Sequence, residues 1–225
     1  YRLTDFVLNI MNPFYLDIGF TKVEIAEVRK VFGTVATMAG IFLGGFAVAR
    51  WGLMRSLVIG AFLAPVSHLA FAWLAVVGPD VQALLIAIGI ENAASAFAGT
   101  VLIAYMSSLT RVGFTATQYA LFSSLYSLPG KLLASQSGRI VEASAHSADS
   151  GGLFSGLKGL FAATPPQAYA HALEKSQVSP QALGAGYLVF FVYSAGIGFL
   201  AIVLVLIVAA KQPAHAAAVE KRALP

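Results

Sequence analysis

Three ionisable residues, Asp5, Glu91 and Lys131, lie in stretches of the chain that are otherwise strongly apolar. A charge at bilayer depth costs roughly 2.5 to 3.5 kcal/mol, so such residues point to ion pairs, proton pathways or solute sites. Glu91 could carry a proton or balance a fixed charge, and Lys131 could pair with Glu91 or Asp5 or hold an anionic solute. The structural alternatives are a helix-start acid at Asp5, a Glu91 that only bonds neighbouring helices, and a Lys131 salt bridge that only fixes packing.

Amide side chains add to the polar character of the apolar stretch that contains Asp5. Asp5, Asn9 and Asn12 are spaced i, i+4 and i+7, so on a helix they form one polar stripe that must face protein or a water-filled cavity. Pro13 lacks a backbone donor and disfavours helix at the residue before it. We therefore expect a helix break there, with carbonyl oxygens left to bind a solute.

Two further stretches carry polar groups where a lipid-facing helix would not. Asn92 follows Glu91 among small residues, which allow a helix or a ligand to approach closely. Gln118 and Tyr119 begin a segment that continues with several serines and reaches Lys131, so this helix is polar over much of its circumference. Asn92, Gln118 and Tyr119 join Asp5, Asn9, Asn12, Glu91 and Lys131 as the predicted lining of a solute and proton pathway.

Other patterns are less specific for function. Gly40-x-x-x-Gly44 with Gly45 indicates close helix packing, with a moving helix contact as the alternative. His68 is predicted to be a hydrogen-bonded packing residue. No spacing in the chain resembles a metal site, a P-loop, a dinucleotide fingerprint or a nucleophile elbow, so we expect no enzyme activity, cofactor or metal.

The composition places these residues in a membrane protein. Of 225 residues 58% are hydrophobic and 11% charged, and the mean hydropathy is +0.80, whereas a soluble domain has about 25% charged residues. The net charge of +4 arises from basic residues scattered singly beside apolar runs, which argues for anchoring at lipid headgroups and against a nucleic-acid partner. The absence of cysteine excludes disulfides and thiolate sites.

Six apolar stretches are predicted to cross the bilayer, since each crossing needs about 20 residues. The predicted fold class is all-α: a polytopic membrane protein with six transmembrane helices. Five spans fill residues 1–143, a polar loop with short helices covers 144–185, the last span covers 186–211, and 212–225 form a tail. The individual spans are expected at 1–19, 28–49, 56–77, 81–107, 116–142 and 186–210.

Helix-start and charge signals refine this topology. Thr21 followed by Glu24 has the spacing of a capping box. Arg50, Arg55 and the basic tail fall on one face, predicted to be cytoplasmic by the positive-inside rule, which puts the long loop in the periplasm. The chain opens at Tyr1 with neither an initiator Met nor a signal-peptide pattern, so we expect it to be cut from a longer protein.

The run from Phe114 to Leu121, with Glu91-Asn92 upstream and Pro129-Gly130-Lys131 downstream, resembles the C-terminal half of AmpG-type muropeptide permeases of the major facilitator superfamily. The opening Tyr1-Arg2-Leu3-Thr4-Asp5 is similar to the start of the seventh helix of these permeases. Two departures are Lys131, where the family commonly has Arg, and the long loop after Glu142.

The resemblance implies half of a facilitator-type bundle whose partner is an N-terminal six-helix half. It further implies proton-coupled uptake of anhydro-muropeptides across the bacterial inner membrane, for cell-wall recycling, by a multi-pass protein. Two alternatives remain open: a related acetyl-CoA-type transporter, and a non-transporting membrane subunit or assembly factor of a larger membrane complex. Another membrane subunit would then be the partner.

Overall fold

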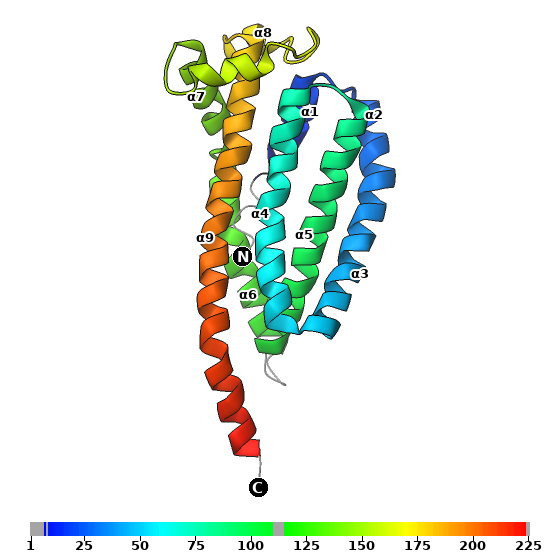
Figure 1. Ribbon diagram of the computed structural model, residues 1–225, viewed down its shortest axis with the longest axis vertical. Coiled ribbons are helices and arrows are strands. Elements are labelled where there is room, and N and C mark those ends of the chain that lie inside the picture. The colour runs from blue at the N-terminus through cyan, green and yellow to red at the C-terminus, as the bar shows by residue number, and fades with distance from the viewer. Residues whose placement is uncertain (1–6, 8, 110–114, 224–225) are drawn as a thin grey trace.

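The computed structural model describes residues 7, 9–109 and 115–223, and the secondary structure in these ranges is helical throughout (Figure 1). The predicted all-α fold class is therefore confirmed for the described part of the chain. In chain order the elements are α1 (Met11–Ile18), α2 (Lys22–Val28), the π-helical turn η2 (Arg29–Gly33), α3 (Thr34–Trp51), α4 (Leu53–Val77), α5 (Val81–Leu109), α6 (Thr115–Ala134), α7 (Ser137–Asp149), the 3-10 helix η3 (Ser155–Phe161), α8 (Ala172–Ser176) and α9 (Pro180–Ala223).

Four helical rods are long and apolar enough to cross a membrane, and they match four predicted spans. They are the continuous run of α2, η2 and α3, then α4, α5 and the first part of α9. Their ends fall at glycines or polar residues, as at Gly52 between α3 and α4 and Gly78 after α4, both of which have positive φ. The described residues thus contain four candidate spans rather than the six expected.

The first predicted span differs most from the structure. Within the described part of residues 1–19 only α1 is helical at length, with 8 residues. Pro13 lies in the first turn of α1, where a missing N–H is tolerated, so it does not break the helix. Asn9 lies in a 3-10 turn that precedes α1, and Asn12 lies in α1, so the two are not on one continuous α-helix. Asp5 lies outside the described residues.

The predicted single helix over 116–142 is also wrong. The chain forms α6 and α7 there, separated by a turn at Ser135 and Gln136. Neither helix is among those apolar and long enough to span a membrane, because serines and Lys131 dilute the apolar content of α6 and α7 is largely polar. Lys131 and the preceding Gly130 are accommodated within the helix.

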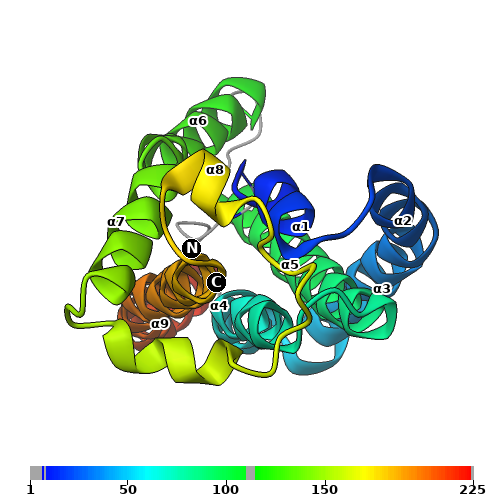
Figure 2. The same cartoon turned by 90° about the horizontal axis from the view of Figure 1, so that it is seen from above.

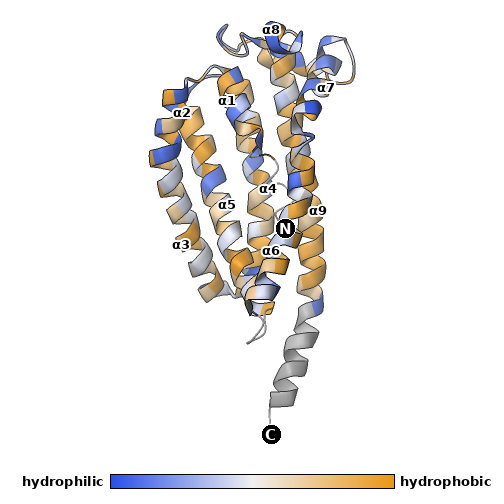
Figure 3. Ribbon diagram, turned by 180° about the vertical axis from the view of Figure 1, so that it is seen from behind, coloured by the Kyte–Doolittle hydropathy of each residue, from blue (hydrophilic) through white to orange (hydrophobic). Residues whose placement is uncertain are grey.

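The long helices pack side by side as a bundle (Figures 1 and 2). Contacts run from α3 to α5, from α5 to α4, from α4 to α9 and from α9 to α7, and α6 contacts α5. Helices α1, α2 and α8 lie at one end of the bundle, and the turn from α3 to α4 lies at the other (Figure 1). Hydrophilic residues gather near α2, α7 and α8, and apolar residues run along the long helices (Figure 3).

Buried aromatic rings hold α1 between α4 and α9. Phe14 is fully buried, and its ring centroid lies 4.8 Å from that of Phe191 and 5.0 Å from that of Tyr187, both on α9. Phe71 of α4 completes the cluster, with its centroid 5.7 Å from that of Phe191. Contacts between aromatic rings contribute about 0.5 to 1.5 kcal/mol per pair and hold α1 in place despite its short length.

Glycines allow α3 and α5 to approach closely. A Cβ atom added at Gly40 would collide with the carbonyl oxygen of Ala93 and lie 2.9 Å from the Cβ of Ala96. A Cβ at Gly44 would lie 3.1 Å from the carbonyl oxygen of Phe97, whereas one at Gly45 would meet open space. The predicted packing role is confirmed for Gly40 and Gly44.

Two local predictions about helix starts can be compared with the structure. The capping box is confirmed: Glu24 N donates to Thr21 Oγ1 at 3.2 Å, and Thr21 N donates to Glu24 Oε2 at 2.8 Å. The expected short helices of the 144–185 loop appear as η3 and α8. The α7 helix also extends into this region, as far as Asp149.

The segment that holds η3 and α8 is tied to the bundle through Asp17 at the end of α1. The Asp17 carboxylate accepts hydrogen bonds from Lys175 Nζ and from Tyr187 Oη, each at 2.7 Å. Its backbone oxygen accepts from Tyr169 N at 2.8 Å. Asp17 is not singled out from the sequence, although it lies between Leu16 and Ile18 in an apolar run, because these three partners come from segments far along the chain.

Candidate functional site

A buried polar cluster joins α4, α5 and α9 inside the bundle. Glu91 of α5 is 6% exposed and His68 of α4 is 3% exposed. His68 Nε2 lies 3.8 Å from Glu91 Oε2, and His68 Nδ1 lies 3.2 Å from Ser194 Oγ on α9. Ser67 Oγ completes the set, 2.6 Å from Glu91 Oε2. Two titratable groups therefore face each other in an apolar interior.

The serine hydroxyls fit more than one protonation state of their neighbours. Ser67 Oγ lies 2.6 Å from the Glu91 carboxyl and 2.7 Å from the carbonyl oxygen of Ala64. It can donate to an ionised Glu91, or it can accept from a protonated Glu91 while it donates to Ala64. A hydroxyl of this kind keeps the carboxyl hydrogen-bonded whether or not it holds a proton.

Ser194 has the same arrangement on the far side of the imidazole. Its Oγ donates to the carbonyl oxygen of Phe191 at 2.7 Å and also faces His68 Nδ1. With its proton committed to Phe191, Ser194 accepts from Nδ1–H, which leaves Nε2 of a neutral His68 as the acceptor that faces Glu91. The cluster can therefore hold a proton on Glu91 or on His68.

His68 is the member that the sequence interpretation undervalued. It was predicted to be a hydrogen-bonded packing residue, and it is hydrogen-bonded, but it is also the titratable neighbour of Glu91. The available signal was the Ser67-His68 pair in the middle of an apolar run. A single sequence does not show that His68 and Glu91, which lie on different helices, are close to each other in space.

Asn92 points away from this cluster, as expected for consecutive residues about 100° apart on a helix. It is half-buried and lines a groove of about 450 Å³ between α3 and α5. A Cβ atom added at Gly33 would lie 2.7 Å from Asn92 Nδ2, so the amide fits against the glycine of the π-helical turn. The described lining of this groove includes the polar residues Thr37, Asn92, Ser95 and Thr100.

The remaining predicted pathway residues lie elsewhere on the bundle. Asn9 is exposed, and the Asn12 side-chain oxygen accepts a 2.8 Å hydrogen bond from Arg29. Gln118 and Tyr119 are half-buried on α6. Asn12 lines a pocket at the α1 end of the bundle, whereas Asn92 lines the groove between α3 and α5.

Lys131 is exposed on α6, and it forms no salt bridge with any other residue that the structure describes. The ion pair with Glu91 considered for it is therefore absent. Glu91 instead faces Ser67 and His68 among its neighbours. In the described ranges no three His, Asp or Glu side chains gather in a way that could hold a metal ion.

Comparison with known proteins supplies the decisive observation. The chain is 40% identical over 142 residues to "Putative transporter AmpG 4" of Rickettsia conorii, a match that covers 63% of this chain and 34% of that protein. The chain is homologous to AmpG transporters. It is also 39% identical over 139 residues to the protein named AmpG 3 of Rickettsia prowazekii, covering 61% of this chain and 33% of that protein.

Similarity to AmpG proteins extends to a third group of relatives. The chain is 34% identical over 142 residues to the protein named AmpG 1 of Rickettsia bellii, covering 63% of this chain and 35% of that protein. The chain thus spans about a third of the length of the curated relatives it matches. No family model matches the chain, and no solved structure matches it.

The AmpG relatives are named transporters rather than enzymes. This homology and the four candidate spans together place the chain in a membrane.

Proposed function

We propose that this chain is the C-terminal half of a proton-coupled secondary transporter of anhydro-muropeptides in the bacterial inner membrane. Homology to AmpG transporters supports the transport class, and the resemblance at Glu91-Asn92 and Gln118-Tyr119 supports the solute. The observation that carries the coupling is Glu91, a carboxyl 6% exposed inside a membrane bundle with a hydroxyl and an imidazole beside it. Groups of this kind form proton relays in pumps and transporters.

Alternating access gives these residues a common role. This half would rock against an N-terminal six-helix half, with the solute bound between the two near the midplane. Asp5, Asn9, Asn12 and Asn92 would line the pathway with hydrogen-bonding groups, as would Gln118 and Tyr119 of α6. The exposed Lys131 would then hold a carboxylate of the peptide moiety from α6.

The proton would bind at the Glu91 cluster. In one conformation Glu91 takes the proton and hydrogen-bonds to Ser67, and in the other it releases the proton as its surroundings change. His68 Nε2 is the adjacent group that can receive the proton, at 3.8 Å from the carboxyl. While the proton moves between Glu91 and His68, the two groups are either both neutral or an ion pair, so this transfer avoids the large cost of burying an unpaired charge.

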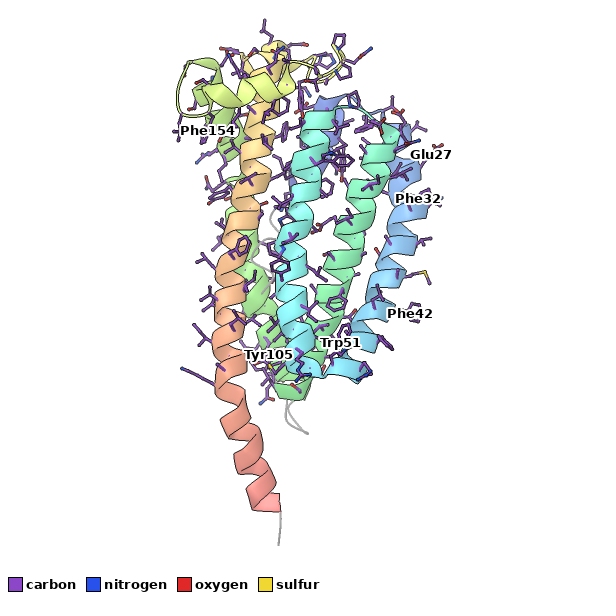
Figure 4. The ribbon with its side chains drawn as sticks, viewed as in Figure 1. Glu27, Phe32, Phe42, Trp51, Tyr105 and Phe154 are labelled. Atoms are coloured by element: carbon purple, nitrogen blue, oxygen red, sulfur yellow. The ribbon has the colours of Figure 1, made fainter. Side chains whose placement is uncertain are left out.

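Uptake of labelled anhydro-muropeptide tests this proposal. The full-length protein that carries this chain is placed in vesicles, and uptake is measured with and without an inward proton gradient. Glu91→Gln should abolish gradient-driven uptake while solute exchange at equal pH persists, because the amide keeps the hydrogen bonds but cannot release a proton. Glu27→Gln, an exposed acid on α2 (Figure 4), is the matched control and should transport normally. Gradient-driven uptake at the wild-type rate in Glu91→Gln would remove the coupling role.

A further inference from the structure

A second pocket, apart from the Glu91 cluster, opens at the end of the bundle where α1 and α2 lie. Its volume is about 570 Å³. Its lining comes from α1, α2 and the π-helical turn η2, which follow one another in the chain. The described residues that line it are Asn12, Leu16, Lys22, Ile25, Ala26, Arg29 and Lys30.

The pocket is strongly basic. Lys22, Arg29 and Lys30 supply three cations, and the described lining contains no acid. Three acids are sequence neighbours of lining residues. Asp17 accepts hydrogen bonds from Lys175 and Tyr187, and Glu24 is held by Thr21, whose backbone N and Oγ1 lie 2.8 Å and 2.7 Å from Glu24 Oε2. Glu27 is exposed and forms no salt bridge with another described residue. Neither Lys22 nor Lys30 forms a salt bridge with another described residue. The positive charge of the pocket is thus available to a ligand.

Arg29 is pre-positioned within this pocket. Its Nη1 donates a 2.8 Å hydrogen bond to Asn12 Oδ1, which ties the π-helical turn η2 to α1. A guanidinium carries five N–H donors in a rigid fork, so further donors remain for an anionic oxygen. Arg29 and Lys30 are the first residues of the π-helical turn, and turns of this type are frequent at functional sites.

The apolar part of the pocket lining indicates that the ligand also has hydrocarbon groups. Leu16, Ile25 and Ala26 form a hydrocarbon wall beside the cations. The pocket also lies at the beginning of the rod Lys22–Trp51, which is long enough to cross the bilayer, so it sits at the level of lipid headgroups. A ligand that fills it needs an anionic group for the three cations and methylene groups for the wall.

We propose that this pocket binds the phosphate group of an amphiphilic anion, with Arg29 as the principal contact. A fork donor and two ammonium groups suit a phosphate monoester or diester. The phosphate can belong to an anionic phospholipid or to a soluble organophosphate, and the same atoms recognise both. Asn12 belongs both to this pocket and to the proposed solute pathway, whereas Arg29 and Glu91 lie in different sites. Phosphate binding measured in Arg29→Gln and proton-driven uptake measured in Glu91→Gln therefore distinguish failure of this site from failure of the proposed transport function.

Direct binding to the purified full chain in detergent tests the proposal. The probe is fluorescent phosphatidylglycerol, with phosphatidylcholine of the same acyl chains as the neutral comparison and glycerol phosphate as a soluble competitor. Arg29→Gln should weaken phosphatidylglycerol binding roughly tenfold, the size expected for a charge-assisted hydrogen bond. Arg29→Lys should fall between the two, since it keeps the charge and loses the fork. Arg50→Gln, at the other end of the same rod, should bind as the wild type does.

The outcomes separate the sources of the phosphate. Competition by glycerol phosphate supports a soluble ligand, and phosphatidylglycerol binding without such competition supports a lipid headgroup. Equal binding of phosphatidylglycerol and phosphatidylcholine, or unchanged binding in Arg29→Gln, overturns the proposal. Lys22→Gln provides a second variant on an exposed side chain, so that misfolding of one variant, detected by circular dichroism, still leaves a decisive measurement.

Discussion

The Tyr169 hydroxyl donates a 2.9 Å hydrogen bond to the backbone carbonyl oxygen of Ala75. Ala75 stands in the last turn of α4, and the residue that would normally donate to its carbonyl, four positions later, is Pro79, which has no N–H. Tyr169 therefore satisfies a buried acceptor that the helix cannot. This contact is one of those that hold the segment between α7 and α9 over the end of the bundle.

Removing this hydroxyl should loosen the segment. Tyr169→Phe keeps the buried ring but leaves the Ala75 carbonyl unsatisfied, which should cost about 1 to 3 kcal/mol of unfolding free energy. Thermal unfolding in detergent and proteolysis within residues 150–179 measure the effect. Tyr193→Phe, on the exposed side of α9, is the control. Equal stability of both variants would contradict the role assigned to the hydroxyl.

Asp149 should make the attachment of this segment acid-sensitive. A hydrogen bond from Ser179, 2.5 Å away, and the positive charge of Lys158 at 3.6 Å lower the pKa of the Asp149 carboxyl. A depressed pKa stabilises the folded state above the unfolded value of about 3.9. That stabilisation is lost as the pH falls through the folded pKa.

The acid sensitivity can be measured with Asp149→Asn. The wild type should be the more stable at pH 7, and the two melting temperatures should converge as the pH falls below about 4. Ser179→Ala should remove most of the same pH-dependent difference, since its hydroxyl is the main cause of the lowered pKa. If the difference in melting temperature between wild type and Asp149→Asn stayed constant as the pH fell below about 4, ionisation of Asp149 would not be the cause of the acid sensitivity.

The crossing of α3 and α5 should tolerate bulk at one glycine and reject it at another. Gly40→Leu places a side chain against the backbone of Ala93, whereas Gly45→Leu extends into open space. The first should destabilise by about 1 to 3 kcal/mol, the range for overpacking, and the second by far less. Folded yield and melting temperature in detergent compare the pair. Matching losses would mean that the helices do not approach at Gly40.

Ser67 should influence proton coupling through Glu91. Ser67→Ala removes the hydroxyl that stays hydrogen-bonded to either form of the carboxyl, so gradient-driven uptake should fall roughly tenfold through a cost of about 1 to 2 kcal/mol. Ser95→Ala, on the groove side of α5, is the matched control and should leave the dependence of uptake on pH unchanged. A pH profile of uptake unaltered by Ser67→Ala would remove Ser67 from the proton path.

The sequence was sufficient to predict the positions of the long apolar helices. It was not sufficient where tertiary contacts determine where a helix ends. The predicted spans at 56–77 and 81–107 begin and end within three residues of the observed helices, because glycines and polar turns bound uniformly apolar runs. The span predicted at 28–49 lies inside the longer helical run Lys22–Trp51. The turn at Ser135 and Gln136 contains neither proline nor glycine, so the sequence gives no signal for a turn there. It follows instead from the packing of α7 against α9, which one sequence cannot show.

The candidate site could be predicted from the sequence only in part, for the same reason. Glu91 could be identified, since a carboxyl in an apolar run stands out. Its neighbour His68 comes from a helix 23 positions earlier in the chain, and Lys131, the partner considered from charge alone, lies exposed on α6. Opposite charges in a list of residues do not determine which helices meet.

The π-helical turn at Arg29–Gly33 carries an evolutionary consequence. A turn that closes with i to i+5 hydrogen bonds accommodates one more residue than an α-helical turn does. Deleting a single residue there would restore ordinary helix and swing Lys22 and Ile25 by about 100° around the axis relative to Gly40 and Gly44. A homologue whose alignment has a one-residue gap at this turn would keep the glycine crossing while its basic side chains faced another direction.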